Sequence, residues 1–594
     1  MKYTAREVKE IFLNFFQKNN HKKIKNSSII PENDDSLLFI NAGMAPIKNV
    51  FTGEQIPESK KMCNIQTCIR TNDIDSIGDM HHLSSFCMLG SWSIGDYFKE
   101  GAIKLAYDFL VNELKIPKKK LYVTVFSGDS KRNLPADEES EGLWQEVGVE
   151  KSHIVRKPFE DNFWRMGEGE SPCGPCTEVF FDTENEKIKS YEETGFFDDK
   201  NRYIEIWNAG VFMQYLQHED GTYSKLKMNS VDTGAGMERM IMALNNFKSV
   251  YESEIFMPII QLIKNNVPNC NEKSLRIIVD HIRSSVYIIN AGVEAGNLKR
   301  GYILRQLLRR AIRHLKSIGA NETLLQNIAR STIENLDKCG LNPDWAFTKE
   351  EIIQKITSEQ EKFSKLLVSG LKTFEEFIAN KNNIKNGKIN SALVFKLYDT
   401  FGFPFEITKE LANEKGLKVD DKEFNELFDQ HKNISKGETG KVFKSGLADV
   451  SEQTIKLHTA THLLHSALKK VLGENVNQKG SNITPERLRF DFNFERKLTD
   501  DELMQVENLV NNLIEKNLAV ICEEMDYEKA KKSGAIGLFQ NKYGDKVRVY
   551  SIGEYSKELC SGPHVENTKA LGKFKITKEE SSSAGVRRIK AILQ

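Results

Sequence analysis

The fold is decided by residues 62–100, which have the sequence MCNIQTCIRTNDIDSIGDMHHLSSFCMLGSWSIGDYFKE. The pattern predicts a strand over 63–70, a polar loop over 71–80 rich in Asn, Asp and Gly, and a returning strand over 84–89. Gly90, Gly95 and the polar residues between them predict a turn before a helix. We therefore expect a hairpin whose loop and strand ends can contact a ligand.

Two side chains of this hairpin can bind a nucleotide. Arg70 lies where the first strand meets the loop, and a guanidinium offers a planar fork of donors that matches phosphate oxygens. Phe86 lies on the returning strand and can offer a ring face to a base. By itself, however, an arginine beside a loop is more often a solvated surface residue.

A second stretch, MNSVDTGAGMERMIMA at residues 228–243, predicts a strand, a glycine turn and an apolar helix. Asp232 ends the predicted strand, and Gly234 lets backbone approach a ligand closely. Arg239 opens the helix, so two guanidinium groups could hold both ends of one triphosphate.

These two stretches resemble motifs two and three of class II aminoacyl-tRNA synthetases. Further segments resemble the alanyl-tRNA synthetases within that class, and the similarity runs over nearly the whole chain. The matching segments are FINAGM (39–44), CIR (68–70), MLGSWSIGDYFK (88–99), PCGPCTE (172–178), VDTGAGMER (231–239), RGYILRQLLRRAIRH (300–314) and LYDTFGFP (397–404).

The resemblance implies a multidomain α+β fold. Residues 1–245 are expected to form an antiparallel-sheet catalytic domain for ATP and alanine, and residues 246–435 a mainly helical domain for the tRNA acceptor stem. Residues 436–594 are expected to form an α+β zinc-binding editing domain, which begins in the Gly-, Ser- and Lys-rich segment 430–455. We expect a form that lacks the family's usual C-terminal extension.

The net charge, the cysteine count and the lengths of the apolar runs limit the class of protein. Lys and Arg number 84, as do Asp and Glu, so the formal net charge is zero and an RNA site must be a local basic patch. Nine cysteines at scattered spacings suit a reducing cytosol, and we expect a cytoplasmic protein. No apolar run reaches the roughly eighteen residues of a membrane span. Whether the chain is a monomer or a homodimer is left open.

The resemblance assigns roles in the first domain. Arg70 and Arg239 hold ATP together with Mg²⁺, Phe86 stacks on adenine, and Asp232 pairs with the ammonium group of L-alanine. The amino-acid pocket is expected to contain Trp164, Asn208, Val211, Asp232 and Gly234. From composition alone Trp164 is a buried packing residue, because large aromatic side chains mostly pack. The family more often has one residue fewer between Asn208 and Val211.

A basic segment predicts the RNA contact. Arg305, Arg309 and Arg313 recur every four residues and share a helix face, with Arg310 close by. A solvated basic face is the alternative, but a dense basic stripe in a neutral chain favours phosphate contact. By resemblance, Asp399 and Asn297 lie at the G·U pair in the acceptor stem of alanine tRNA. The family's asparagine just before Arg-Gly-Tyr is replaced here by Lys299.

Two clusters near the C-terminus predict a metal site. His458 and His462 lie four residues apart and project from one face of a helix. Cys560 and His564 follow about a hundred residues later, and three histidines with one cysteine suit one Zn²⁺ ion. We expect His465 to pack beside the site. The arrangement resembles the editing domain of alanyl-tRNA synthetases, in which Gln478 matches a pocket glutamine.

There is a chemical reason for one chain to contain both a site that activates alanine and a site that hydrolyses mischarged tRNA. A pocket separates alanine from glycine by roughly 1–3 kcal/mol, and it rejects the added hydroxyl of serine poorly. We therefore expect an enzyme that forms alanyl-adenylate, charges the 3′-terminal adenosine of alanine tRNA and hydrolyses seryl- and glycyl-tRNA in the zinc-containing domain. The alternatives are a hydrolase of mischarged tRNA with a weak first site, and a synthetase-like RNA-binding regulator.

Overall fold

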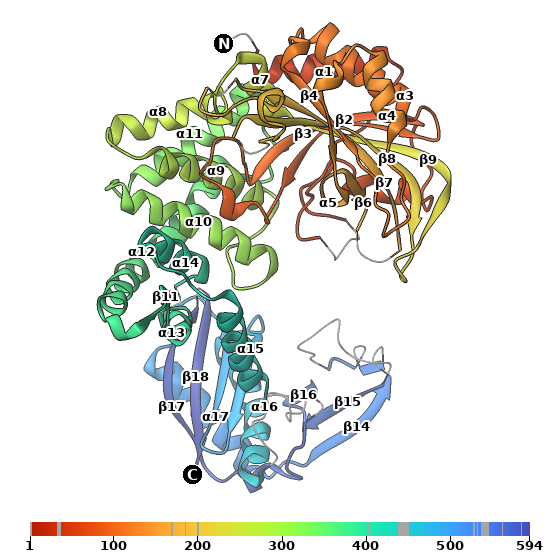
Figure 1. Cartoon of the computed structure of the whole chain (residues 1–594). Coiled ribbons are helices and arrows are strands. Elements are labelled where there is room, and N and C mark those ends of the chain that lie inside the picture. The colour runs from red at the N-terminus through yellow and green to blue at the C-terminus, as the bar shows by residue number, and fades with distance from the viewer. Residues whose placement is uncertain are drawn as a thin grey trace. The chain divides into compact units, whose positions relative to one another are not determined.

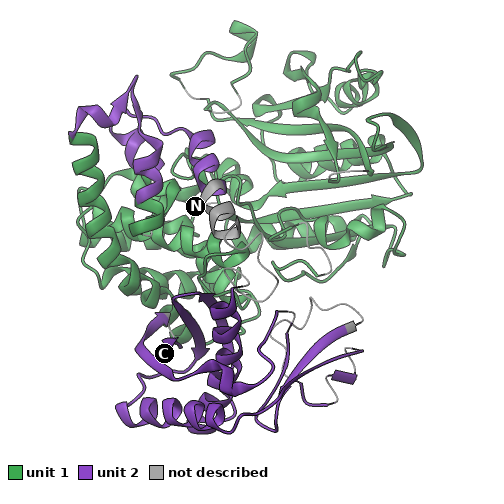
Figure 2. Ribbon diagram, turned by 90° about the horizontal axis from the view of Figure 1, so that it is seen from below, with its two compact units in different colours: residues 1–379, 397–408 green, residues 380–396, 409–594 purple. Residues whose placement is uncertain are grey.

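The computed structural model forms two compact units (Figure 2). The first unit contains Met1–Ala379 and Leu397–Thr408, and the second contains Asn380–Lys396 and Lys409–Gln594. The predicted three-part division by function stays a prediction, and of the predicted boundary segment, residues 438–450 lie outside the described residues. The structure describes residues 3–32, 37–167, 170–184, 186–198, 201–401, 403–437, 451–526, 529–530, 533–535, 546–560, 562–583 and 585–594.

A large, mainly antiparallel sheet forms the centre of the first unit (Figure 1). Only the pairs β1–β2 and β4–β5 are parallel among its described strands, and β6 (Phe163–Arg165) adds to β7. In spatial order the strands are β1 (Lys22–Lys23), β2 (Lys61–Ile69), β3 (Ser85–Ile94), β9 (Tyr223–Gly236), β8 (Tyr203–Gln217), β7 (Ser171–Asp182), β4 (Leu121–Phe126) and β5 (Ile154–Lys157).

Helices pack on this sheet through apolar faces (Figure 1). Helix α1 (Ala5–Lys18) begins at Thr4, whose hydroxyl accepts from Glu7 N while the Glu7 carboxylate accepts from Thr4 N. Its buried side chains Phe12 and Phe16 contact Trp207 on β8. The other helices that contact the sheet here include α3 (Lys99–Tyr107), α4 (Glu138–Glu146) and α7 (Met237–Asn245).

The predicted hairpin is confirmed, but Gly90 in β3 and Gly234 in β9 do not form the turns that the sequence predicted. Strand β3 continues through Gly90 to Ile94, and β9 continues through Gly234, so the turns predicted at these two glycines are wrong. A Cβ atom on Gly90 would lie 2.5 Å from the ring of Trp92, and one on Gly234 would lie 2.7 Å from Met88 Sδ. Glycine is therefore needed for close packing, whereas Gly95, at φ +60°, does turn the chain.

The rest of the first unit is helical. Helix α9 (Glu272–Asn290) is buried along nearly its whole length and packs against α10 (Lys299–Ser317). Around this pair lie α8 (Met257–Asn266), α11 (Leu324–Cys339) and α12 (Lys349–Ala379). Farther along the chain come α13 (Ser391–Phe401), through which the boundary between the units passes, and α14 (Phe405–Glu414). No helix in the described part of the chain has the length and apolar character needed to cross a bilayer.

The second unit is built on two sheets. Its larger sheet packs against α16 (Glu452–Leu472) and α17 (Asp500–Glu515), which enclose an apolar core. In spatial order the strands of that sheet are β12 (Gln478–Thr484), β13 (Arg487–Asn493), β18 (Val586–Leu593) and β17 (Phe574–Ser583). The smaller sheet contains β14 (Val520–Asp526), β15 (Lys546–Ile552) and β16 (Ser556–Leu559). The unit also contains α15 (Asp421–Gly437) and the short hairpin of β10 (Ile384–Lys385) and β11 (Lys388–Ile389).

Replacing Gly90 with alanine tests the packing explanation. G90A should lower the free energy of unfolding by about 1–3 kcal/mol, because the added methyl group overlaps the buried Trp92 ring. G142A is the matched control, since Gly142 lies in α4 with no atom within 4 Å of its added Cβ. Loss of a helical glycine should stabilise the chain by about 0.5–1 kcal/mol. Urea unfolding of both variants measures the difference, and a G90A chain as stable as G142A would contradict the explanation.

Candidate active site and metal centre

A cavity of about 260 Å³ lies in the first unit at the meeting point of β3, β7, β8 and β9. It is lined by side chains from both stretches that the sequence singled out, although these stretches lie far apart along the chain. Its lining includes all eight residues predicted for ATP and alanine, namely Arg70, Phe86, Trp164, Asn208, Val211, Asp232, Gly234 and Arg239. The cavity is therefore the candidate active site.

Strand pairing joins the two stretches. In the β3–β9 ladder Gly90 lies opposite Gly234, and Trp92 lies opposite Asp232. The indole Nε1 of Trp92 donates a hydrogen bond of 2.7 Å to Asp232 Oδ1. Burial raises the pKa of the Asp232 carboxyl to about 7, and the Trp92 hydrogen bond opposes this rise. Among the described residues no cationic side chain influences this half-buried carboxylate, which is therefore well suited to bind an ammonium group.

A β-bulge explains the extra residue between Asn208 and Val211. Asn208 pairs with Gly234 and Val211 pairs with Asp232, so two residues of β8 face a single residue of β9. Gly234 and Asp232 are two apart and share one face of the sheet, and the bulge brings Asn208 and Val211 to that face. All four residues line the cavity. Asn208 Oδ1 is buried without a hydrogen-bond partner among the described residues, so it can accept from a ligand.

Two guanidinium groups also face this cavity. The Arg70 guanidinium lies 4.9 Å from the ring centroid of Phe86, and its Nε donates to Asn41 O at 3.2 Å. Arg239 Nη1 donates to Glu205 O at 3.0 Å and to Glu205 Oε2 at 3.2 Å. Each arginine keeps further N–H donors, since a guanidinium has five. The arrangement can bind an anion with two separate positive groups.

The sequence analysis missed several residues that line the cavity. Glu178 and Glu205 add carboxylates from β7 and β8. His81 and His82 lie in the loop between β2 and β3, and burial lowers the pKa of His81 to about 4. The Asp79 carboxylate accepts from the backbone N–H groups of both histidines and from the His82 ring, which holds its pKa well below the usual range. For His81 and His82, the sequence feature that could have identified them is the pair of adjacent histidines in a predicted loop.

Helix α9 holds this loop from behind. Asp280 accepts hydrogen bonds from Ser84 N, at 2.8 Å, and from the Ser84 hydroxyl. The ring of His281 bonds Asp280 through Nδ1, at 2.9 Å, and accepts from Arg310 through Nε2, at 3.2 Å. A buried ion pair between Arg283 and Glu238 joins α9 to α7, and Arg283 also bonds a backbone carbonyl of β3. The loop and β3 are therefore held by Asp280, His281, Arg283 and Arg310, which are not among the residues that line the cavity, and by Glu238, which is.

The prediction of a phosphate-facing arginine stripe is wrong for three of its members. Arg309, Arg310 and Arg313 are only 9%, 6% and 4% exposed. Arg310 donates to the carbonyl oxygens of Ile74, at 2.6 Å, and Ile77, at 3.4 Å, in the β2–β3 loop. These arginines are buried, and Arg309 and Arg310 bond partners that are remote in sequence, Glu359 and the carbonyl oxygens of the β2–β3 loop. Charge spacing alone could not distinguish this arrangement from an RNA-binding face.

Arg309 and Arg313 are bonded inside the protein as well. Arg309 Nε donates to Glu359 on α12 at 2.7 Å, and Arg313 Nη1 bonds the ring of His314 at 3.1 Å. Both guanidinium groups therefore stabilise the helical packing.

The remaining RNA candidates lie at the surface of the first unit. Asp399, on α13, is exposed, and so is Asn297, in the loop before α10. Asn297 Oδ1 accepts a hydrogen bond from Arg305, which is half-buried and also pairs with Glu359. Their roles toward tRNA stay predictions.

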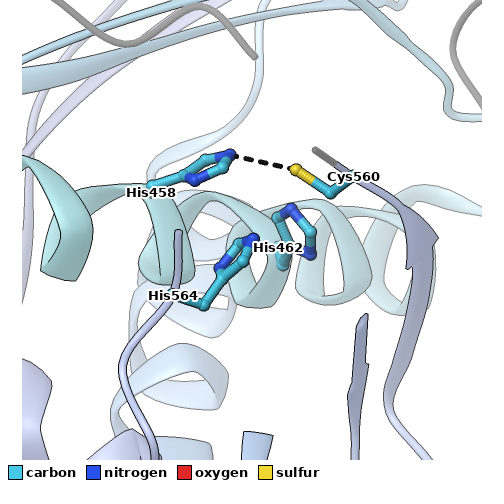
Figure 3. A group of neighbouring side chains, drawn as sticks. All are labelled: His458, His462, Cys560 and His564. Atoms are coloured by element: carbon cyan, nitrogen blue, oxygen red, sulfur yellow. Dashed lines mark hydrogen bonds between the residues drawn. The ribbon is translucent and has the colours of Figure 1, made fainter. Parts of the chain in front are cut away.

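The second unit brings the four predicted metal ligands together (Figure 3). His458 and His462 lie on α16, and Cys560 and His564 lie in the segment after β16. One ligand atom from each lies within 4.8 Å of all the others. Cys560 Sγ lies 3.4 Å from His458 Nε2. This donor set and compactness fit a tetrahedral Zn²⁺ site.

The Nδ1 atoms of His458 and His564 also support a zinc site, because each bonds a protein oxygen. His458 Nδ1 donates to Pro563 O at 3.0 Å, and His564 Nδ1 bonds Thr459 Oγ1 at 3.1 Å. These bonds leave Nε2 of each ring for a metal, and His564 Nε2 is buried with no partner among the described residues. Burial lowers the pKa of His458 to about 3 and that of His564 in the same direction, so both rings stay neutral, as metal binding requires.

Two further residues were predicted near this centre. His465 packs behind the cluster as expected, and its Nδ1 lies 3.0 Å from Glu558 Oε1. Gln478 is the first residue of β12 and is half-buried opposite Phe492. Its role in an editing pocket stays a prediction.

Comparison with known proteins identifies similar sequences over the whole chain. The family profile of class II (A) tRNA synthetases matches residues 7–485, and that of the second additional domain of threonyl and alanyl tRNA synthetases matches residues 547–590. The alanine–tRNA ligase of Borreliella afzelii is 44% identical, over 99% of each chain. That of Treponema denticola is 45% identical, over 100% of this chain and 99% of its own. That of Francisella tularensis is 36% identical, over 99% of this chain and 79% of its own.

Replacing Asp232 with asparagine tests the electrostatics of the cavity. Because the folded-state pKa of Asp232 is raised to about 7, ionising this carboxyl destabilises the fold as pH rises from about 4 to 7. D232N should therefore gain stability over the wild type across that interval, by up to about 4 kcal/mol, and the gain should level off above pH 7. Denaturant unfolding from pH 4.5 to 8.5 measures it.

The variant D75N is the matched control, because Asp75 is an exposed carboxylate in the β2–β3 loop. It removes one negative charge without changing the cavity. A D232N advantage that stays constant between pH 4.5 and 8.5 would contradict the raised pKa.

Proposed function

The chain belongs to the alanine–tRNA ligase family of class II aminoacyl-tRNA synthetases, and we propose how its residues perform that family's reaction. The family match spans most of the chain, and the ligases of Borreliella afzelii and Treponema denticola are matched along nearly their full length. The alternatives of a regulator without catalysis and a hydrolase alone are not favoured. The enzyme joins L-alanine to the 3′-terminal adenosine of alanine tRNA, using ATP and releasing AMP.

One observation carries the assignment of the active site: Arg70, Asp232 and Arg239 line the same cavity. Arg70 holds the α-phosphate of ATP while the alanine carboxylate attacks it in line, and Arg239 holds the far end of the triphosphate. Phe86 stacks on the adenine ring, and the Arg70 guanidinium lies 4.9 Å from the centroid of the Phe86 ring. These donors are fixed before the substrate arrives, so they need little reorganisation in the transition state.

The amino-acid end is formed by β8 and β9. Asp232 binds the alanine ammonium, whose charge offsets the burial of the carboxylate, and Trp92 keeps the carboxylate in place. Asn208 Oδ1 accepts a further hydrogen bond from the substrate. Trp164 and Val211 pack together with apolar neighbours beside the cavity, and they close the space around the methyl group.

A Mg²⁺ ion bound with ATP would neutralise charge on the departing pyrophosphate. Glu178 and Glu205 are two carboxylates of the cavity lining that would bind it, because hard divalent cations prefer oxygen ligands. Glu205 also pairs with Arg239, so it orients that guanidinium until the triphosphate binds.

The second unit hydrolyses mischarged tRNA in our proposal. His458, His462, Cys560 and His564 would hold one Zn²⁺, which would supply a Lewis acid next to the ester of seryl- or glycyl-tRNA. Gln478 contacts that substrate. A separate hydrolytic site is required because the alanine pocket gains too little binding energy to reject serine and glycine.

The acceptor stem is recognised by exposed groups of the first unit. Asp399 accepts from the guanine amino group of the G·U pair in the wide, shallow groove of A-form RNA. Asn297, held by Arg305, contacts the same pair. Arg309, Arg310 and Arg313 are buried and therefore do not contact the acceptor stem in this proposal.

Alanine-dependent exchange of pyrophosphate into ATP tests the first site. The wild type should catalyse the exchange, and R239M should lower kcat/KM for ATP at least about 100-fold, because a charge-assisted phosphate contact is lost. R132M is the control, since Arg132 is an exposed arginine paired with Asp129 outside the cavity. A folded wild-type enzyme without exchange activity would overturn the proposal.

Metal content and deacylation test the division between the units. C560A should lose zinc and the hydrolysis of seryl-tRNA, while pyrophosphate exchange stays within about twofold, because its active site lies in the other unit. C270A, which removes a free cysteine of the first unit, should keep both activities. If exchange disappears in a folded C560A chain, the two sites are not independent.

A further inference from the structure

One metal ligand differs from its neighbours in how its ring is held. His458 and His564 each bond a protein oxygen through Nδ1, but His462 Nδ1 is buried with no hydrogen-bond partner among the described residues. Glu558 Oε2 lies 3.9 Å from His462 Nδ1. Nearly every buried imidazole N–H in proteins has a partner, so this nitrogen requires one.

We propose that Glu558 is the positioning residue of this metal site: its carboxylate accepts from His462 Nδ1 and thereby directs His462 Nε2 at the zinc ion. The inference rests on the proposed zinc site and adds a residue that does not itself bind the metal. Carboxylate–histidine–zinc arrangements fix the tautomer and the ring orientation of the ligand. Closing a gap of 3.9 Å to hydrogen-bond distance requires a shift of about 1 Å, which metal loading can supply.

The fold places Glu558 on the side of β16 that faces the histidines of α16. Glu558 lies on β16, opposite Tyr550 of β15, and it is two residues before Cys560. Residues two apart on an extended chain point to the same side, so the carboxylate and the thiolate both face α16. On α16, His458, His462 and His465 follow at intervals of four and three residues and share one face. His465 Nδ1, 3.0 Å from Glu558 Oε1, fixes the carboxylate from behind.

Charge balance supports the same role. The Glu558 side chain is only 10% exposed, and its ion-pair partners among the described residues are His462 and His465, with no lysine or arginine. A buried carboxylate needs a positive partner. A Zn²⁺ ion with one thiolate ligand retains a single positive charge, which the Glu558 carboxylate neutralises. The carboxylate is thus more stable in the metal-loaded protein than in the metal-free one.

Zinc affinity of the full chain tests the proposal. Competition with a chromophoric chelator should show one tight zinc ion per wild-type chain and a dissociation constant about 10- to 100-fold higher for E558A. E558Q keeps an acceptor oxygen and should fall between the two. E554Q is the matched control, because Glu554 is an exposed acid four residues earlier, and it should bind zinc like the wild type.

A second measurement separates positioning from simple structural support. Metal-free E558Q should melt at or above the temperature of the metal-free wild type, because it lacks the uncompensated buried charge, while zinc should raise its melting temperature less. The visible spectrum of the Co²⁺-loaded protein should also change in E558A, because His462 is no longer oriented.

Three results would overturn the proposal. If E558A binds zinc as tightly as the wild type, Glu558 does not position the ligand, although the zinc site itself stands. If metal-free E558Q is destabilised as much as the loaded form, the residue only supports the fold. If the wild type binds no zinc, the proposed metal site and this inference both fail.

Discussion

The pairing of β3 with β9 is the constraint on which the active site depends. Along the chain, Arg70 and Phe86 are separated from Asp232 and Arg239 by roughly 150 residues, and only this antiparallel ladder brings them to one cavity. The register matters as much as the pairing, because a slip of one residue would turn Asp232 to the opposite face of the sheet. The hydrogen bond from Trp92 to Asp232 depends on that register, and the glycines of both strands allow the close approach that it needs.

Much of the buried charge in the first unit serves to hold this pair of strands and their loop in place. Arg283 and Glu238 form a buried pair behind β3, and Arg310 bonds loop carbonyls through a chain that also contains His281 and Asp280. Removing one member would leave the other buried and unpaired, which typically costs 3–5 kcal/mol. Rigid support of this kind suits a site that must position two substrates for in-line transfer. Helices α9 and α10 therefore support the site through side chains that do not line the cavity, whereas α7 also contributes Arg239 to it.

The sequence predicted which residues gather at each of the two sites better than it predicted their local geometry. Short motifs identified Asp232, Arg239 and the four metal ligands, because those residue types at that spacing have few other uses. The glycine turns were wrong, since glycine permits close packing in a strand as readily as a turn, and the pattern does not distinguish them. The β8 bulge lies where the chain has one residue more than the family usually has between Asn208 and Val211, but the residue pattern alone does not show that the extra residue forms a bulge. The buried arginines were misjudged for a related reason: their partners, such as Ile74 O and Glu359, are remote in sequence. Asn208 and Val211 were found only through resemblance, and the bulge explains why they share a face.

The central claim is that one cavity binds the nucleotide with two arginines and the amino acid with Asp232. A crystal structure with a non-hydrolysable alanyl-adenylate analogue tests it most directly. The account predicts the ammonium group of the analogue at the Asp232 carboxylate, its phosphate mimic at Arg70 and its adenine ring against Phe86. An analogue bound with its ammonium group away from Asp232, or with Arg70 facing solvent, would contradict it.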